Sequence, residues 1–369
     1  MKTLIVGAGI MGLSTAWALN KRGHKVTVVE QGPIPNPLGS SVDQHRLIRF
    51  PYGAMDGYAA MVSHAYPAWD RLWDDLGRRL YVKTGTLAVG TSGQDWLNDS
   101  AAVLEAQNHE LERLPPDDLV ARFPLLRGND IDQAFYLDSG GVLLAGRIVE
   151  VLAHHLARRG VTLMPHHAAT EIDPDQATVQ LRDGRTLEAD NLIVAAGPWV
   201  GRLLPDAASR VSASRQVLVY LKPPVDLQAG WAAMPMLLDI EPDRGFYLIP
   251  PVAGTGLKIG DHSFSMAGDP DLDREATEDE ARALFALCEN RLASFDQFSL
   301  DAGKTCFYTV HPPEERFIVE PAGASSWVMT GFTGHGFKFG PLMGETVADA
   351  LEGHRRAEEV SRWAAGYID

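Results

Sequence analysis

Three glycines and one acidic residue near the N-terminus have the types and spacing needed to bind a dinucleotide. Gly7, Gly9 and Gly12 form a G-x-G-x-x-G pattern, and Glu30 follows about twenty residues later. Gly7 permits a tight turn, Gly9 lets backbone N–H groups approach a pyrophosphate, and Gly12 lets a helix pack closely on a strand. Glu30 would accept a hydrogen bond from a ribose 2′-hydroxyl and repel a 2′-phosphate, which disfavours NADP and leaves FAD or NAD.

The elements around these residues support that interpretation. Lys2 to Val6 is an apolar run that predicts a strand, Met11 to Leu19 predicts a helix, and Lys25 to Glu30 predicts a second strand. A glycine-rich turn can be a plain connection between a strand and a helix. Here the strand before it, the helix after it and the acid at the end of the next strand favour an adenine dinucleotide, with its phosphates at the helix N-terminus.

Further candidate contacts occur in two later stretches. Arg46 and Arg49 lie in the loop after the dinucleotide-binding unit, a common position for ligand contacts, although both could be solvated residues of a surface helix turn. The apolar strand in NLIVAAGPWV ends at Gly197. Its place in the order of elements favours a second cofactor contact there over a plain buried turn.

A glycine-rich stretch near the C-terminus is another candidate contact region. Gly334 and Gly336 lie beside Lys338, just before a helix that is predicted from about Pro341. Backbone amides in such a stretch can approach an anion or a carbonyl. We therefore expect Gly334, Gly336 and Lys338 to contact the cofactor.

Length and composition indicate a two-domain globular protein whose ligands are small molecules. At 369 residues the chain exceeds the usual size of a single core. Its formal net charge of -15 opposes binding to nucleic acid and to anionic lipid, and no apolar run approaches the length of a membrane span. Cys288 and Cys306 have neither disulfide nor metal-ligand spacing, so we expect a cytoplasmic protein without a metal site.

The order of predicted helices and strands indicates an α/β protein with a second sheet. The helix Ala145 to Arg159 is followed by the strand Val161 to Met164, which continues the α/β pattern, and residues 177–188 predict a hairpin. Short strands separated by turn residues between 214 and 261 predict an antiparallel or mixed sheet. Thr277 to Leu292 predicts an amphipathic helix that begins with a capping box.

Several longer motifs resemble the monomeric sarcosine oxidase group of the D-amino-acid-oxidase-like flavoproteins. With the glycine fingerprint and Glu30, they are GSSVDQHRLIR, YLIP followed by GLKIGDH, KTCFYTV and GFTGHGFKFG, so the resemblance covers nearly the whole chain. It implies an α/β fold: a Rossmann-like FAD-binding domain with an inserted α+β substrate domain built on a mixed, largely antiparallel sheet. We expect the FAD-binding domain to comprise residues 1–80, 140–213 and 320–369, and the substrate domain to comprise residues 81–139 and 214–319.

The resemblance implies roles for three residues around the flavin. Cys306 would form a thioether to the flavin and make FAD covalent, whereas its position alone would fit a half-buried strand cysteine. Such a thiol must be presented to the ring rather than buried in apolar core. Lys258 would activate oxygen, because its charge would stabilise superoxide and the reduced flavin anion; a solvated lysine of an edge strand is the alternative. Arg46 would lie near the flavin.

The resemblance also implies a substrate site. Arg49 and Lys338 would hold the substrate carboxylate, which agrees with the hydrogen bonding of a guanidinium and an ammonium. Tyr247 and His262 would shape the amine side, although a lone histidine is often structural. The two cations would lower the pKa of the amine, so no strong general base is required. The implied reaction is oxidation of a small α-amino acid, an N-methyl or cyclic secondary amine, by FAD and oxygen to an imine and hydrogen peroxide.

The chain departs from the family pattern in three places. The family's histidine-containing stretch before the two arginines is replaced by Val42-Asp43-Gln44-His45, and the segments after Arg49 and around Asp239 to Arg244 match no sarcosine-specific enzyme. These departures leave the substrate side chain open.

Other functions also stay open on the sequence. An FAD-dependent amino acid dehydrogenase with a non-oxygen acceptor and a flavin-binding partner protein without turnover remain alternatives. An NAD-dependent enzyme is disfavoured by the strand that carries Cys306. We expect a monomer or a small homo-oligomer.

Overall fold

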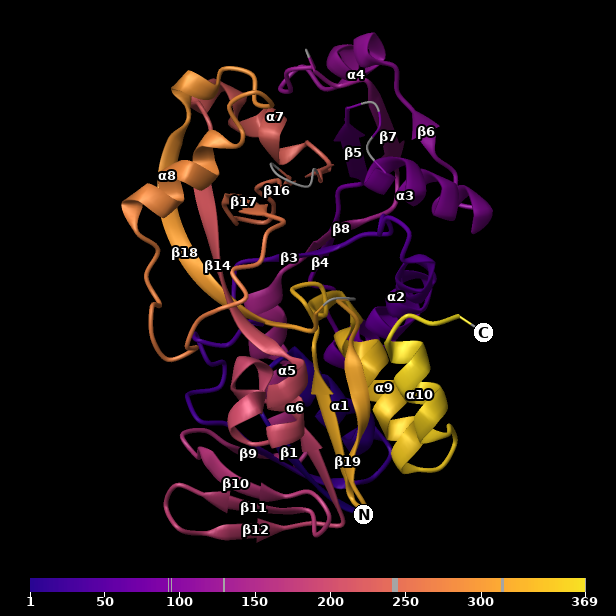
Figure 1. Cartoon of the computed structure of the whole chain (residues 1–369), viewed down its shortest axis with the longest axis vertical. Helices are drawn as coiled ribbons and strands as arrows, with labels where there is room; N and C mark the ends of the chain where they lie inside the picture. Colours follow the sequence, from indigo (N-terminus) through magenta and orange to yellow (C-terminus); the bar gives the residue numbers. More distant parts are fainter. Residues whose placement is uncertain (92, 94, 129, 241–244, 313–314, 369) are drawn as a thin grey trace.

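Two large β-sheets organise the chain, one in each half of the molecule (Figure 1). The computed structural model describes residues 1–369 except 92, 94, 129, 241–244, 313–314 and 369. Part of the segment from Asp239 to Arg244, which matched no sarcosine-specific enzyme, therefore lies outside the described residues.

The lower half in Figure 1 holds a six-stranded sheet with the strand order β19-β20-β13-β1-β2-β9. Neighbouring strands are parallel, except that β19 and β20 are antiparallel. Sequences such as KTLIV and KVTVV are apolar and β-branched, as expected for parallel strands that are covered on both faces. The strands are β1 (Lys2–Val6), β2 (Lys25–Val29), β9 (Thr162–Met164), β13 (Asn191–Val194), β19 (Ile318–Gly323) and β20 (Ser326–Thr330).

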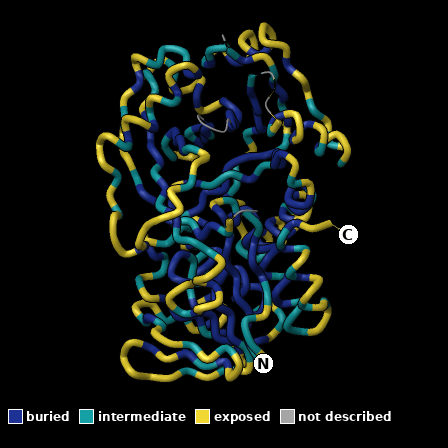
Figure 2. The backbone as a smooth tube through the Cα atoms, in the orientation of Figure 1, coloured by how far each residue is buried: buried dark blue, intermediate teal, exposed yellow. Residues whose placement is uncertain are grey.

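Helices from distant parts of the chain pack around this sheet. The first helix, α1 (Ile10–Lys21), packs against α5 (Ala145–Arg158) and α9 (Gly340–Leu351), and α9 in turn contacts α2 (Asp56–Leu76) and α10 (Ala357–Ala364). Figure 2 shows that buried backbone fills the interior of this half, whereas exposed segments lie at its periphery. The arrangement is the predicted Rossmann-like unit, in which ligands bind at the carboxyl ends of the parallel strands.

The upper half holds an eight-stranded sheet with the order β18-β14-β17-β16-β15-β5-β7-β6. It is mixed and largely antiparallel, as predicted, because only the β5–β15 pair is parallel among its described strands. The strands are β5 (Thr86–Gly90), β6 (Glu112–Arg113), β7 (Gln133–Leu137), β14 (Ser212–Lys222), β15 (Met236–Asp239), β16 (Phe246–Ile249), β17 (Leu257–Asp261) and β18 (Ser299–Val310). Its helices are α3 (Asp95–Ala106), α4 (Pro116–Arg122), α7 (Gln228–Ala232) and α8 (Glu278–Ala286).

Two smaller sheets complete the fold. The first has the order β3-β8-β4 and lies between the two halves in Figure 1; it is built from β3 (Arg46–Ile48), β4 (Tyr81–Lys83) and β8 (Gly141–Leu143). The second, at the bottom of Figure 1, contains β10 (Ala169–Asp173) and the predicted hairpin of β11 (Thr178–Leu181) and β12 (Thr186–Glu188). A short helix, α6 (Pro205–Arg210), follows β13.

Two local predictions are wrong. Residues Arg46–Ile48 form a strand paired with β8, so the alternative of a surface helix turn for this stretch fails. The helix predicted to end at Leu292 ends at Ala286, and the chain continues in tight turns that bring Arg291 inward to pair with Asp239. The capping box at Thr277 is present, and Cys288 is a core residue, as predicted.

Two further observations bear on the expected organisation. The domain boundaries predicted from the sequence stay a prediction. Among the described residues, no helix is both long and apolar enough to cross a membrane, and no group of three or more histidine, cysteine or acidic residues is arranged to hold a metal ion.

Candidate functional site

A cleft opens at the carboxyl ends of β1 and β2, where the glycine fingerprint lies. Gly7 has a φ of +107°, and a Cβ at this position would lie 2.3 Å from the carbonyl oxygen of Ala195, so only glycine fits. A Cβ at Gly12 would lie 2.0 Å from the carbonyl oxygen of Gly7. Gly9 is the N-cap of α1 and lines the cleft, as do Ile10 and Met11. The N–H of Ile10 donates a hydrogen bond to Oγ of Ser41 (2.9 Å), and the start of the helix faces the cleft, where an anion is favoured.

Glu30 follows β2 and lines the same cleft. Its carboxylate is buried and accepts hydrogen bonds from the backbone N–H of Ala8 (2.9 Å), the backbone N–H of Gly32 (3.0 Å) and Nδ2 of Asn36 (2.9 Å). These contacts fix the acid against the glycine turn and the loop after β2. The predicted hydrogen bond to a ribose hydroxyl stays a prediction.

The other predicted cofactor contacts lie mostly in this cleft. Gly197, Gly334, Gly336 and Arg46 are among its lining residues. Lys338 is not: it lines a second cavity. The structure thus brings the N-terminal, central and C-terminal glycine stretches together at the cleft. Lys338, from the C-terminal stretch, lines the second cavity instead.

The second cavity has a volume of about 620 Å³ and adjoins the cleft. Four residues line both spaces: Arg46, Tyr308, Gly334 and Phe337. All five predicted catalytic residues line the cavity, namely the four assigned to the substrate and Lys258, which was assigned to oxygen: Arg49, Tyr247, Lys258, His262 and Lys338. A molecule in the cavity would therefore lie next to whatever fills the adjoining end of the cleft.

Arg49 follows β3 and presents an unsatisfied cation to this cavity. Its guanidinium carbon lies 4.7 Å from the ring centroid of Tyr52 and 5.9 Å from that of Trp96. Its Nη1 is buried and makes no hydrogen bond with the part of the chain that the structure describes. Burial lowers the pKa of Arg49, because desolvation disfavours the charged form. A buried guanidinium in this state needs an anion.

Lys338 supplies a second buried cation in the same cavity. Its Nζ donates hydrogen bonds to the hydroxyl of Tyr52 (2.8 Å) and to the carbonyl oxygen of His335 (3.0 Å). Burial and, to a lesser extent, the charge of Arg49 hold the pKa of Lys338 well below its usual value. Neither Arg49 nor Lys338 forms an ion pair with any residue that the structure describes.

Tyr247 and His262 line other parts of the cavity. Tyr247 comes from β16, and burial, partly offset by the charge of Arg46, raises its pKa to about 12, so its hydroxyl is protonated at neutral pH. His262 directly follows β17 and is accessible from the cavity. Burial, with the nearby charge of Arg49, lowers the pKa of His262 to about 4. A neutral imidazole can donate or accept a hydrogen bond without adding a third positive charge beside Arg49 and Lys338.

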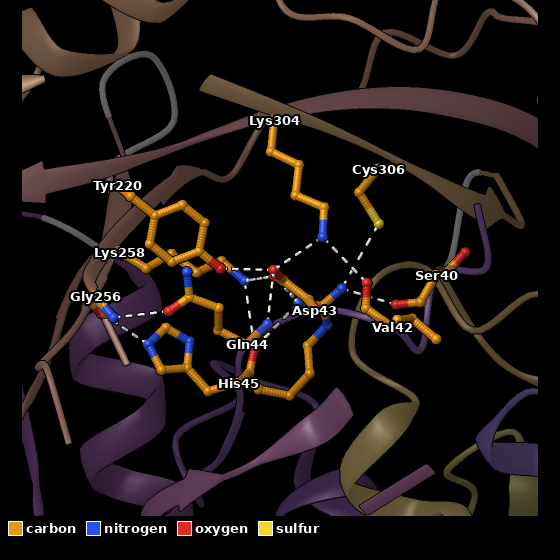
Figure 3. A network of polar contacts seen from close by, with 11 residues as sticks. Ser40, Val42, Asp43, Gln44, His45, Tyr220, Gly256, Lys258, Lys304 and Cys306 are labelled. Atoms are coloured by element: carbon orange, nitrogen blue, oxygen red, sulfur yellow. Dashed lines mark hydrogen bonds and ion pairs between the residues drawn. The ribbon is translucent and has the colours of Figure 1, made fainter. Parts of the chain in front are cut away.

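Lys258 lies in the middle of the eight-stranded sheet, on β17 between β14 and β16. Its side chain is 1% exposed, so the alternative of a solvated edge lysine is wrong. Its Nζ forms an ion pair with Oδ2 of Asp43 at 2.5 Å, and Asp43 also pairs with Arg46 (Figure 3). The two cations predicted to lie near the flavin therefore share one buried carboxylate.

Cys306 lies on β18 beside Arg46. Its Sγ accepts a hydrogen bond from Nη2 of Arg46 at 3.7 Å, and its side chain is buried with Leu218, Tyr220 and Tyr308. Cys306 lines neither space itself, whereas its strand neighbours Tyr308 and Thr309 line the cleft. The thiol thus contacts a cation at the edge of the cleft instead of lying wholly among apolar side chains.

Comparisons with known proteins identify the family to which the chain belongs. The family model described as DAO, FAD dependent oxidoreductase, matches residues 2–350. The chain belongs to this family of FAD dependent oxidoreductases. It is 29% identical over 367 residues to monomeric sarcosine oxidase from Bacillus sp. (strain B-0618), covering 95% of this chain and 92% of the relative. It is 26% identical over 357 residues to N-methyl-L-tryptophan oxidase from Salmonella arizonae, with coverages of 95% and 94%.

A solved structure shows the same fold. NikD, described as an unusual amino acid oxidase essential for nikkomycin biosynthesis, superimposes with a TM-score of 0.83 at 23% identity and covers 98% of this chain and 96% of its own. As an FAD dependent oxidoreductase, the chain needs a site for a dinucleotide. The glycine turn, the start of α1 and the buried Glu30 at the carboxyl ends of the parallel strands fit that requirement.

The sequence did not indicate four residues that the structure places in the site. Tyr52 and His335 position Lys338, Trp96 covers Arg49, and Asp43 pairs with Lys258. Asp43 was noticed only as a departure from the family pattern. A signal existed for Tyr52, because an aromatic residue three positions after Arg49 is well placed for a cation–π contact.

Proposed function

We propose that the chain oxidises a small α-amino acid with an N-methyl or cyclic secondary amine, and that oxygen accepts the electrons. The amino acid would lose two electrons and two protons to become an imine, which water hydrolyses, and oxygen would gain them to become hydrogen peroxide. One observation carries the proposal: a buried guanidinium without a partner in the described protein, beside a second buried cation, in a cavity that adjoins the dinucleotide cleft.

The relatives support this substrate class. Sarcosine and N-methyl-L-tryptophan, which occur in the names of two relatives, share a carboxylate and an N-methyl secondary amine and differ in side-chain size. The groups that would recognise the shared part are the cations of the cavity. The cavity of about 620 Å³ leaves room for a side chain, which sarcosine lacks.

The carboxylate of the substrate would bind between Arg49 and Lys338. A carboxylate there would satisfy Nη1 of Arg49 and would offset the desolvation that lowers the pKa of both cations. The same positive charge lowers the pKa of the substrate amine and favours its neutral form, which is the form that can be oxidised. Tyr247 and the neutral His262 would line the amine side without adding charge.

Residues of the cleft would hold FAD, which when bound supplies the electron acceptor for the amine. Gly7, Gly9 and the start of α1 would bind the pyrophosphate, and Glu30 the adenosine ribose. We further propose that Cys306 attaches the cofactor covalently. This is supported by the contact of its Sγ with Arg46, which lines both the cleft and the cavity.

Lys258 would present positive charge to oxygen. Its ammonium is buried, lines the substrate cavity and is held by Asp43, and a fixed charge in a site with little water stabilises an anion as it forms. Arg46, which lines both the cavity and the cleft, would add a second fixed charge at the junction.

A substrate screen with two readouts tests the reaction class. The purified yellow protein is mixed with N-methyl amino acids, cyclic imino acids and D-amino acids, and hydrogen peroxide release is measured in air. Loss of flavin absorbance is followed in parallel without oxygen. We expect at least one secondary amino acid to give both signals. Bleaching without peroxide would indicate a dehydrogenase, and no bleaching by any secondary amino acid would contradict the proposed substrate class.

Acid denaturation tests the covalent link separately. After precipitation with acid, we expect the yellow colour to remain with the polypeptide, and digestion to yield a flavin-bearing peptide that contains Cys306. Cys306→Ser is the matched control and should release its flavin. If the wild-type protein also releases all its flavin into the supernatant, the attachment at Cys306 is wrong.

A further inference from the structure

Asp43 is a buried carboxylate at the centre of a network of cations (Figure 3). It lies in the loop between β2 and β3, in the stretch where the sequence departs from the family pattern. Its side chain is 1% exposed, as is that of Lys258. Oδ2 accepts hydrogen bonds from Nζ of Lys258 at 2.5 Å and from Nη1 of Arg46.

The second carboxylate oxygen is satisfied as well. Oδ1 accepts hydrogen bonds from the hydroxyl of Tyr220 (2.6 Å), from the backbone N–H of Gln44 (2.9 Å) and from Nζ of Lys304 (3.3 Å). Lys304 is 40% exposed and also donates to the carbonyl oxygen of Val42, so it closes the network on its solvent side. Three cations and two neutral donors thus converge on one acid, which fixes its position.

The position of Lys258 depends on this acid. The ammonium has a second, longer contact with the carbonyl oxygen of His45 at 3.4 Å, and the ring of His45 bonds to the carbonyl oxygen of Gly256. Without Asp43, the strongest contact of Lys258 would be lost, and its charge would face Arg46 in a buried site. A buried ammonium in that state would give up its proton.

The balance of charge around Lys258 follows from the groups that face it. Asp43, His45 and Arg46 face it from the loop and from β3, and Cys306 from β18. Burial and the charge of Arg46 lower the pKa of Lys258 to about 8, whereas the charge and hydrogen bond of Asp43 act in the opposite direction. His45 is neutral at pH 7, because burial and the charge of Lys258 lower its pKa to about 4.

We propose that Asp43 is a positioning residue that holds Lys258 in place and in its charged form, so that a fixed cation faces the substrate cavity at neutral pH. The inference rests on the role of Lys258 that is proposed above. Because Asp43 also binds Arg46, one acid orients both cations at the junction of the cleft and the cavity. The departure from the family pattern at this stretch then has a function in the reaction with oxygen.

The experiment compares Asp43→Asn with the wild-type holoenzyme, with Asp43→Glu and with Tyr220→Phe. Asparagine removes the charge at nearly constant shape, glutamate keeps it, and phenylalanine removes one hydrogen bond to Asp43 without changing any charge. The pKa of the Lys258 ammonium is measured by NMR of lysines labelled with 15N, and its signal is assigned by its absence in Lys258→Met. The rate of the reaction with oxygen is recorded over the same pH range.

We expect Asp43→Asn to lower the pKa of Lys258 by roughly one to three units. The pH at which the oxygen reaction slows should fall by the same amount, and Asp43→Glu should restore most of the shift. Tyr220→Phe should move the pKa much less than Asp43→Asn. A purely structural role would not shift the pH profile. The proposal is wrong if the pKa of Lys258 is the same in Asp43→Asn and the wild type.

Two further outcomes are decisive. If Asp43→Asn does not fold, the titration of Lys258 in the wild type decides. The proposal would be overturned if Lys258 loses its proton below pH 7. It would be supported if Lys258 stays charged at pH 7 and titrates in the same way in Asp43→Glu. If Lys258→Met reacts with oxygen at the wild-type rate, the role of Lys258 in the proposed function fails. The NMR titration would still test whether Asp43 holds its charge, so the two failures are distinguishable.

Discussion

At the scale of single residues, the site is defined by charges that the protein buries without fully pairing them. Arg49 and Lys338 lie in one cavity, and neither forms an ion pair with a described residue, whereas Lys258 and Arg46 share Asp43. Burying an unpaired charge is unfavourable, so such a group persists where a ligand completes it. On the proposed function, the unpaired cations would bind the substrate, whereas the paired ones belong to the protein's own network.

Arg49→Ala should raise the KM for the amino acid by an amount that corresponds to about 2 to 3 kcal/mol, through loss of a charge-assisted hydrogen bond to the carboxylate. Arg49→Lys is the matched variant, because it keeps the charge but removes the planar fork, and it should retain part of the binding. Steady-state kinetics over a range of substrate concentrations measure both. An unchanged KM in Arg49→Ala would show that the carboxylate binds elsewhere.

Lys258 should impose a pH dependence on the reaction with oxygen. The folded protein lowers its pKa to about 8, so the ammonium is charged below that pH and loses its proton as the pH rises through it. If only the charged form assists oxygen, the rate should fall by up to about tenfold for each pH unit above the pKa. Stopped-flow reoxidation of the reduced enzyme measures this. Lys258→Met should be slow at every pH and lack the transition; a wild-type profile that is flat from pH 6 to 10 would contradict the assignment.

The sequence predicted many of these residues individually but not their partners. The resemblance to a family indicated Arg49, Lys258 and Lys338, since each lies in a recognisable motif. It could not indicate that Lys258 pairs with Asp43, because the two are 215 positions apart and a buried ion pair leaves no local pattern. The contact between Lys338 and Tyr52, which are 286 positions apart, was hidden for the same reason.

At the scale of elements, the close contact of α1 and α9 joins the two glycine-rich loops of the site. The fingerprint leads into the first turn of α1, and the stretch that carries Lys338 directly precedes α9. Small residues make the contact possible: a Cβ at Gly344 would lie 2.5 Å from the backbone of Ser14. Because backbone cannot move aside like a flexible side chain, the separation of the two helices fixes the separation of the two loops.

Gly344→Ala should therefore destabilise the protein, although alanine is the better helix former. An added methyl against the backbone of Ser14 must push the helices apart, at a typical cost of about 1 to 3 kcal/mol. Urea unfolding followed by fluorescence measures the change. Ala350→Gly, in the same helix, gives an upper limit for the contribution of helix propensity, because Ala350 also packs partly against the core. A Gly344→Ala variant that is as stable as the wild type would show that the contact is looser than the structure indicates.

Elements with a strong local signal were predicted well, and those defined by distant pairing were not. The fingerprint strands, the hairpin of β11 and β12 and the capping box of α8 follow from their own sequences. In contrast, β18 begins at Ser299, well before the KTCFYTV motif, because it pairs along its length with β14. The strand β3 is only three residues long and exists through its pairing with β8, so its own sequence does not distinguish it from a turn.

At the scale of the whole molecule, the cleft for the dinucleotide is assembled from segments that span most of the chain. Its lining begins at Val6, includes residues near Glu30, Gly197 and Tyr308, and ends at Phe337. The fold class followed from the alternation of helices and strands, yet the adjoining of cleft and cavity did not, because it depends on how the two large sheets are placed against each other. A ligand that contacts so many segments should stabilise the folded chain as a unit.

Cys306→Ala is the variant in which this stabilisation can be measured, because FAD held without the proposed covalent link can be removed and added back. The thermal midpoint of the flavin-free variant should rise as FAD is added, since FAD binds the folded chain and not the unfolded one. At a free FAD concentration one hundred times the Kd, the stabilisation should be about 2.7 kcal/mol. Scanning calorimetry over a series of FAD concentrations gives the midpoints, and flavin fluorescence gives the Kd independently.

Riboflavin serves as the control, because it lacks the pyrophosphate and the adenosine that Gly9, α1 and Glu30 would contact, and it should raise the midpoint far less. Equal effects of FAD and riboflavin would show that the fingerprint cleft does not bind the adenosine half.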